Sequence, residues 1–164
     1  MTYEEARQQD NEQRIAQIDR VARVTAGGRR FGFRALVIVG DKKGKVGMGV
    51  GKANDVTDAV NKAAKFASKR MIALPLRKGT IPFEITARFK MTRILLKPVQ
   101  KGRGIIAGGV VQDICEAAGV ENINAKVLSA SKSKINNARA VLRAFQKIEK
   151  MLKVKKETHS HLLQ

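Results

Sequence analysis

Basic side chains crowd two glycine-containing turns in the first third of the chain. Residues 27–30 are Gly-Gly-Arg-Arg, and residues 42–45 are Lys-Lys-Gly-Lys. An arginine fork or a lysine point charge can meet a phosphate oxygen, and glycine lets the backbone approach it closely. These residue types in this spacing predict a phosphate-binding surface, and the candidate contacts are Arg29, Arg30, Lys42, Lys43, Lys45 and Lys52.

The charge balance of the chain agrees with a polyanionic partner. The 164 residues carry 33 Lys+Arg against 14 Asp+Glu, a formal net charge of +19. Residues 20–109 hold 21 of the basic and 4 of the acidic residues, so the partner surface is expected in the first two-thirds of the fold. A single surface lysine is more often a solvated charge, but this density favours a nucleic acid. With six Phe, one Tyr and no Trp, base stacking is not expected to be the main mode of recognition.

Glycine occupies every second position of a predicted strand over residues 46–51. Three glycines in register indicate a face that another backbone or a ligand approaches closely. The segment does not form a Walker-type phosphate loop, because Val46 stands where the first glycine of that loop is needed and Ala53 replaces its Ser/Thr. The Gly-x-x-Gly at residues 44–47 lies in a predicted hairpin, whereas the KH loop that it matches joins two helices.

No combination of residues supports catalysis or a metal site. The only histidines, His159 and His161, lie in a polar tail without a cysteine or carboxylate cluster. Cys115 is expected in the core of a helix, and a lone cysteine forms no intrachain disulfide, which suits a reducing cytosol. No stretch approaches the roughly 20 apolar residues of a membrane helix, and the acidic, polar N-terminus resembles no signal peptide. The sequence predicts no enzymatic activity, cofactor, metal, small-molecule substrate or membrane contact.

A second glycine-rich segment, residues 101–109, leads into a predicted helix. Backbone N–H groups at a helix N-terminus can bind an anion. The same loop can equally pack tightly against another protein. The residues alone leave both alternatives open.

The elements that must position these residues form two units of an α+β fold. Residues 1–14 are expected to be a flexible lead-in, because acidic and polar residues dominate there. The first unit, residues 15–74, follows the order β-β-β-α. Its predicted elements are strands at 21–24, 31–39 and 46–51 and a helix over 56–71.

Two prolines and a glycine mark residues 75–82 as a linker. The second unit, residues 83–152, follows the order β-β-α-β-α, and a basic and polar tail is expected over 153–164. Its predicted elements are strands at 81–89, 93–97 and 121–128 and helices at 110–118 and 135–152.

Short motifs occur along the chain in a fixed order. They include Gly27-Gly28-Arg29-Arg30-Phe31, Val46-Gly47-Met48-Gly49-Val50-Gly51-Lys52-Ala53, Gly79-Thr80-Ile81-Pro82, Gly104-Ile105-Ile106-Ala107-Gly108-Gly109 and Ala118-Gly119-Val120. From about residue 15 to 148, this ordered set resembles the bacterial-type small-subunit ribosomal protein five, the universal S-five family.

The resemblance implies a fold, a function and partners. It implies an N-terminal domain like a double-stranded-RNA-binding domain and a C-terminal domain of the family's own type. It implies a structural constituent of the small ribosomal subunit that binds small-subunit rRNA, supports translational accuracy and helps to line the mRNA entry channel. The implied neighbours are the fourth and eighth small-subunit proteins, with the third nearby. A cytoplasmic ribosome is expected, with an organellar one as the alternative.

The resemblance also implies site residues. The extended loop of the family adds Arg20, Arg23, Thr25, Gly27, Gly28 and Phe31 to the expected rRNA contacts, and further contacts are Lys62, Lys65, Lys132, Lys134 and Asn136. The contact with the fourth protein falls on Lys101, Gly102, Arg103, Gly104, Ile105, Gly108 and Gly109, which favours the packing alternative for that loop. Two departures from the family pattern are Ala26, where many relatives have Lys, and a longer, more basic turn over residues 129–136.

The alternative to a ribosomal protein is a free-standing regulator that binds double-stranded RNA. The β-β-β-α order and the high charge motivate this alternative. Such a regulator would form a stable cytosolic pool and would bind duplexes of arbitrary sequence.

Overall fold

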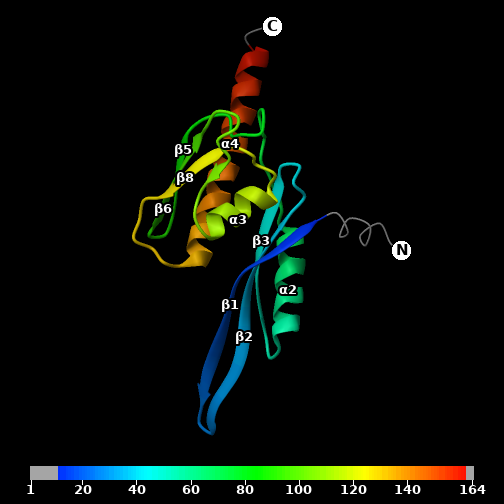
Figure 1. Cartoon of the computed structure of the whole chain (residues 1–164). Helices are drawn as coiled ribbons and strands as arrows, with labels where there is room; N and C mark the ends of the chain where they lie inside the picture. The colour runs from blue at the N-terminus through cyan, green and yellow to red at the C-terminus, as the bar shows by residue number, and fades with distance from the viewer. Residues whose placement is uncertain (1–10, 162–164) are drawn as a thin grey trace, which may run out of the picture.

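The computed structural model describes residues 11–161, and of residues 156–161 only the backbone. Two α+β units follow one another along the chain, as expected (Figure 1). The first unit consists of β1 (Glu12–Thr25), β2 (Gly28–Gly40), β3 (Lys45–Ala53), α2 (Val56–Lys69) and β4 (Ile72–Ala73). The second consists of β5 (Ile85–Phe89), β6 (Thr92–Pro98), β7 (Ile105–Ile106), α3 (Val110–Ala117), β8 (Ile123–Val127) and α4 (Lys134–His161).

Strand β1 is much longer than the predicted strand at 21–24. It begins at Glu12 and pairs antiparallel with β2 along its whole length, as far as Thr25 opposite Gly28. The expected lead-in over 1–14 is therefore wrong for residues 12–14, and its first ten residues lie outside the described part of the chain.

The sequence signal for β1 is weak for a physical reason. A register irregularity between Ile15 and Gln17 interrupts the alternation of apolar and polar residues. Most side chains of the strand are also at least partly exposed. Pairing with the buried strand β2, rather than the apolar content of β1 itself, holds the segment extended.

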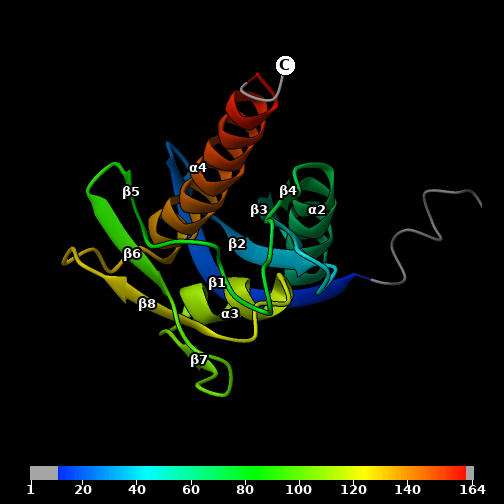
Figure 2. The same cartoon turned by 90° about the horizontal axis from the view of Figure 1, so that it is seen from above.

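Strand β2 is the centre of the molecule, because both of its faces are buried. Ala35, Val37 and Val39 contact α2, while Leu36 and Ile38 belong to the core that the second unit shares. The two units therefore stack as layers in the order α2, first sheet, helices α3 and α4, second sheet (Figure 2).

Helix α2 lies directly on the glycine face of β3. A Cβ atom added at Gly47, Gly49 or Gly51 would lie within 2.3 Å of a backbone carbonyl oxygen of α2. The alternative that the sequence left open is thereby settled, since the backbone that approaches these glycines is that of the helix. Its buried side chains on this face are the small residues Ala59, Ala63 and Ala67.

The second sheet has the order β5-β6-β8-β7, and the first has the order β1-β2-β3-β4. The short strands β4 and β7 were not predicted, because two-residue strands carry no periodic signal. Strand β7 pairs parallel with β8, with Ile105 opposite Ile123. Strand β5 begins at Ile85 rather than at residue 81, whereas β6, β8 and α3 lie within two residues of their predicted bounds.

Helix α4 extends beyond its predicted end at residue 152. It continues to His161, so residues 153–161 of the expected basic and polar tail belong to this helix. Neither glycine nor proline interrupts this stretch, and a helix needs such a residue or a cap to end. No helix in the described part of the chain combines the length and apolarity that a membrane crossing requires.

The turn between β2 and β3 joins the two units. The backbone N–H groups of Lys42 and Gly44 donate to the carbonyl oxygens of Ala117 and Ala118 at 3.1 and 3.0 Å. These carbonyls lie at the C-terminal end of α3, where no intrahelical donor remains for them. The approach is close, because a Cβ at Gly40 would lie 2.0 Å from the Ala117 carbonyl oxygen.

Candidate nucleic-acid interface

The β1–β2 hairpin extends beyond the rest of the fold (Figure 1). In its outer half, residues 20–33, ten of the fourteen residues are exposed and the other four are half-buried. Residues 20–33 include four arginines and no acidic residue. The structure thus brings together the expected contacts Arg20, Arg23, Thr25, Gly27, Gly28, Arg29, Arg30 and Phe31 in one ribbon.

Like charges face each other across this ribbon. Arg23 lies directly opposite Arg30 in the antiparallel register, so both side chains project from the same face. Directly opposed like charges destabilise a strand pair. The nearest acid on the hairpin, Asp19, is already paired with Arg34 at 2.7 Å, which lowers the pKa of the Asp19 carboxyl. An external anion is the natural partner for the two opposed arginines.

The opposite face of the ribbon combines charge with exposed apolar surface. The guanidinium carbon of Arg20 lies 4.0 Å from the centre of the Phe31 ring. Phe31 is 51% exposed and Val24 is 75% exposed. Such contact orients the guanidinium and reduces the entropy lost when it binds a phosphate.

The tip of the hairpin is formed by a short loop, residues 26–27. Thr25 Oγ1 donates to the Gly28 carbonyl oxygen at 3.0 Å and closes the loop from inside. Gly28 has φ +130, a conformation that residues with a Cβ rarely adopt. Gly27 meets nothing within 4 Å, so its lack of a side chain is not required by the chain itself.

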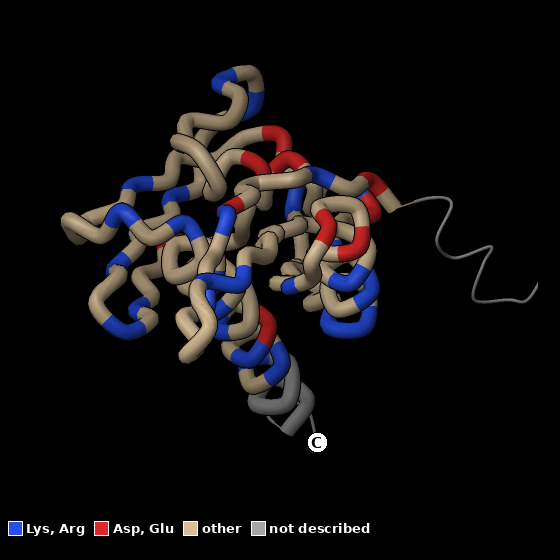
Figure 3. Tube along the Cα trace, turned by 90° about the horizontal axis from the view of Figure 1, so that it is seen from below, with Lys and Arg blue, Asp and Glu red and all other residues tan. Residues whose placement is uncertain are grey.

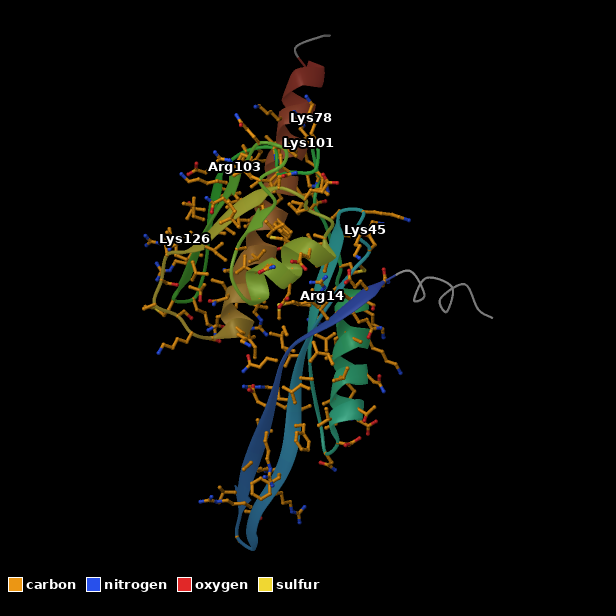
Figure 4. All side chains as sticks on the ribbon, in the orientation of Figure 1. Arg14, Lys45, Lys78, Lys101, Arg103 and Lys126 are labelled. Atoms are coloured by element: carbon orange, nitrogen blue, oxygen red, sulfur yellow. The ribbon has the colours of Figure 1, made fainter. Side chains whose placement is uncertain are left out.

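The second basic turn lies at the far end of the same sheet. Thirteen residues of β2 separate it from the tip, about 40 Å in an extended strand. The predicted surface over residues 20–52 is therefore split in two. Lys42 pairs with Glu12 at 3.0 Å, while Lys43 and Lys45 are exposed, and Figure 4 shows Lys45 pointing away from the body.

The other expected contacts of the first unit lie between these ends. Lys52 stands opposite Arg34 on β3, and Lys62 and Lys65 are exposed on α2. These three lysines lie near the body of the first unit rather than at the tip of the β1–β2 hairpin.

An ion-pair network fixes the start of β1 against α3. Arg14 donates to Glu12 at 2.9 Å and to Glu116, and Glu116 also accepts from the Gln112 amide at 2.8 Å. The hydrogen bonds from Gln112 and Arg14 lower the pKa of Glu116, those from Lys42 and Arg14 lower the pKa of Glu12, and the two carboxylates raise the pKa of Arg14. Figure 4 shows Arg14 between the two units, where it stabilises their junction.

The glycine-rich loop over 101–109 is organised by one buried side chain. Asn122 Oδ1 accepts the backbone N–H groups of Gly102 and Gly104 at 2.9 and 3.1 Å. Positive φ angles account for the glycines at Gly102, Gly104 and Gly109, because residues with a side chain rarely adopt them. Gly108 has neither a positive φ nor a neighbour within 4 Å, so nothing in the described chain requires it.

This loop lies far from the hairpin tip. Figure 4 shows Lys101 and Arg103 beside Lys78 at the opposite end of the molecule. The segment of Lys78 is bound to the start of β8, since the Gly79 carbonyl oxygen accepts the N–H groups of Glu121 and Asn122. Because Asn122 also holds the glycine-rich loop, both segments are anchored at the same point of the fold.

The basic turn before α4 packs beside β1. Lys134 Nζ donates to the Ala16 carbonyl oxygen at 3.3 Å, and the Asn136 N–H donates to Ser133 Oγ at 3.4 Å. Lys132 is exposed. Two of the three expected contacts in this turn thus also serve the fold.

Sequence reasoning missed a group of cations on the second unit. Arg139, Arg143, Lys147 and Lys150 recur at helical spacing along α4 and are exposed. The charge balance drew attention away from them, because residues 110–164 carry a smaller basic excess than residues 20–109. Figure 3 shows basic segments over both units and acidic segments in only a few places.

Comparison with known proteins identifies the family. Residues 11–75 match the model described as ribosomal protein S5, N-terminal domain, and residues 87–158 match ribosomal protein S5, C-terminal domain. The chain belongs to the ribosomal protein S5 family. The family is structural and non-enzymatic, in agreement with the interpretation of the sequence.

Three similar curated proteins carry the name small ribosomal subunit protein uS5. The protein of Treponema denticola is 42% identical over 151 residues, which cover 88% of this chain and 87% of that protein. The protein of Lawsonia intracellularis is 48% identical over 132 residues, 80% of this chain and 78% of its own. The protein of Mycoplasmopsis agalactiae is 48% identical over 137 residues, 83% of this chain, which spans 59% of that longer protein.

Proposed function

We propose that this S5-family chain is a structural constituent of the small ribosomal subunit and binds small-subunit rRNA through the outer half of the β1–β2 hairpin. The observation that carries the proposal is the ribbon of residues 20–33, which is exposed, rich in arginine and free of acids. Membership of the family supports a ribosomal location, and a cytoplasmic ribosome is the expected one.

The hairpin suits recognition of RNA by shape and charge. Arginines project from both faces of the ribbon, with Arg23 and Arg30 on one and Arg20 and Arg29 on the other. A two-stranded ribbon with cations on both faces can lie between two phosphate backbones and contact both. Main-chain atoms at the Gly27–Gly28 loop can approach a phosphate without hindrance.

We further propose that the loop over 101–109 contacts the fourth small-subunit protein. Gly108 supports this proposal, because neither its backbone conformation nor any neighbour within the described chain excludes a side chain. A close external contact would exclude one. Contact with the eighth protein, proximity to the third, a share in the mRNA entry channel and an influence on accuracy belong to the same proposal.

The experiment compares two double variants that remove the same charge. Arg29→Ala with Arg30→Ala removes cations at the tip, and Lys78→Ala with Lys126→Ala removes two exposed cations elsewhere. Affinity for small-subunit rRNA is measured over a range of salt concentrations. Each cation that no longer neutralises a phosphate should reduce the slope of log K against log salt by about 0.7–0.9, so the slope should fall by about 1.5 in the tip variant and hardly at all in the control.

An unchanged slope in the tip variant would place the rRNA contact elsewhere. Sedimentation of cell extracts distinguishes the alternative of a free-standing regulator. A structural constituent travels with small subunits, whereas a regulator leaves a stable pool at the top of the gradient.

A further inference from the structure

A groove separates helix α4 from the β3–α2 side of the first unit. Its volume is about 650 Å³, and its lining comes from β3, α2, the end of β5 and the first half of α4. Met48, Met71 and Leu142 contribute apolar surface to it. Both structural units are needed to form it.

Three arginines and no acid line this groove. Arg70 comes from the C-terminal end of α2, and Arg139 and Arg143 come from α4. Among the described residues, no ion pair involves any of the three. Their charge therefore faces the groove uncompensated.

One aromatic ring holds two of these arginines in place. The guanidinium carbons of Arg143 and Arg139 lie 4.6 and 5.4 Å from the centre of the Phe89 ring. Arg143 Nη1 also donates to the Arg88 carbonyl oxygen at 3.4 Å. Planar groups already ordered against a ring lose less entropy when a ligand binds to them.

A second hollow continues the groove along α4. Its volume is about 500 Å³, and it shares Arg143 and Gln146 with the first. Arg88, Arg93, Lys147 and Lys150 complete its charged lining, again with no acid.

Like charges lie close to one another along helix α4. Arg139, Arg143 and Lys147 are spaced four residues apart, and each like-charged pair at that spacing destabilises a helix. A bound polyanion removes this repulsion. The basic groove, defined as the two hollows together, thus has the properties of a polyanion site.

We propose that the basic groove binds a single-stranded RNA segment, with phosphates along α4 and an unpaired base against the Arg143–Phe89 pair. The inference rests on the proposed function and adds to it a second site remote from the hairpin tip. A double helix of RNA is far too wide to enter a hollow of this volume, so the strand must be unpaired. Bases stack on arginine planes and aromatic rings, and the apolar floor accommodates a base.

The test uses the full chain and a fluorescent twelve-residue oligouridylate, which forms no duplex. The groove variant is Arg139→Gln with Arg143→Gln, since glutamine keeps the helix propensity. The matched control, Lys126→Gln with Lys155→Gln, removes the same charge from exposed positions outside both hollows. We expect the groove variant to bind the oligonucleotide at least tenfold more weakly and with a salt slope lower by about 1.4, while the control changes affinity less than threefold.

The tip variant Arg29→Ala with Arg30→Ala separates this inference from the proposed function. It should keep its affinity for oligouridylate and bind rRNA more weakly. The inference is wrong if the groove variant binds oligouridylate as tightly as the unaltered protein, or if the tip variant loses as much affinity for oligouridylate as the groove variant does. In either case, the rRNA measurement still decides the proposed function. If a twelve-residue polyglutamate displaces oligouridylate at equal concentration, the groove selects acidic peptide, and the inference is likewise overturned.

Discussion

The packing of α2 on β3 predicts a large effect for one added methyl group. In Gly49→Ala, the new Cβ would lie 1.9 Å from the carbonyl oxygen of Ala63 and 2.8 Å from the backbone nitrogen of Ala67. Contacts below 3.0 Å are essentially absent between real atoms of this kind. The helix must therefore retreat by more than about 1 Å, because both obstacles belong to its backbone and cannot rotate away.

The expected loss is about 3 kcal/mol in the free energy of unfolding, the upper part of the range for an overpacked core. In a chain of this length, 1 kcal/mol shifts the midpoint of thermal unfolding by roughly 2–4 °C, so the midpoint should fall by about 6–12 °C. Urea unfolding followed by far-UV circular dichroism measures the free energy. Gly27→Ala is the matched control, since nothing lies within 4 Å of that position, and it should change stability by less than about 0.5 kcal/mol.

A double variant tests the cause directly. Ala63→Gly removes a methyl group from the helix but leaves the carbonyl oxygen that meets the new Cβ. It should add its own loss of about 1 kcal/mol and restore nothing to Gly49→Ala. A stable Gly49→Ala protein, or rescue by Ala63→Gly, would refute the reasoning from backbone contact.

Three further outcomes follow from the structure. The pKa values of Glu12 and Glu116 are lowered in the folded protein, so their contribution to stability is complete above about pH 4.5 and is lost as the pH falls through the folded pKa. Arg14→Met should reduce the loss of thermal stability between pH 7 and pH 3. Equal losses in the variant and the unaltered protein would contradict this. Asn122→Leu leaves the N–H groups of Gly102 and Gly104 without their acceptor, so it should lower the free energy of unfolding by about 2 kcal/mol and speed hydrogen exchange at both groups. Unchanged exchange would show that Asn122 does not order the loop. Burial raises the pKa of Cys115 to about 12, so a thiol reagent at pH 8 should react only in denaturant, and fast reaction with the native protein would be inconsistent with this core.

Much of the fold was predictable because it depends on local patterns. The alternation of glycine with Val46, Met48 and Val50 predicted both the strand and a close approach to it. The alanine stripe predicted α2 and its buried face. Strand β1 was predicted too short, since its extended state depends on pairing with β2 rather than on its own residues.

The candidate site was predictable in composition but not in arrangement. The arginines at 29 and 30 and the lysines at 42 and 43 are close in sequence, yet a long strand lies between the two turns and sends them to opposite ends of the sheet. The cations of α4 follow one another at helical spacing, but their partner Phe89 lies about fifty residues earlier in the chain. Only the tertiary fold brings that ring and those cations together.

The burial of strand β2 on both faces limits where the proposed RNA contacts can lie. In β2, Val37 faces α2 and Ile38 faces the shared core, so neither face of this central strand is open to a ligand. A contact with RNA must therefore use the ends and edges of the layers. The hairpin is the one stretch of this sheet, among the described residues, that continues past both covering layers. The groove beside α4 lies where two layers meet. A rigid sheet covered on both faces thus fixes the distance between the arginine ribbon of the hairpin and the basic groove, and an RNA fold that meets both proposed sites must match that distance.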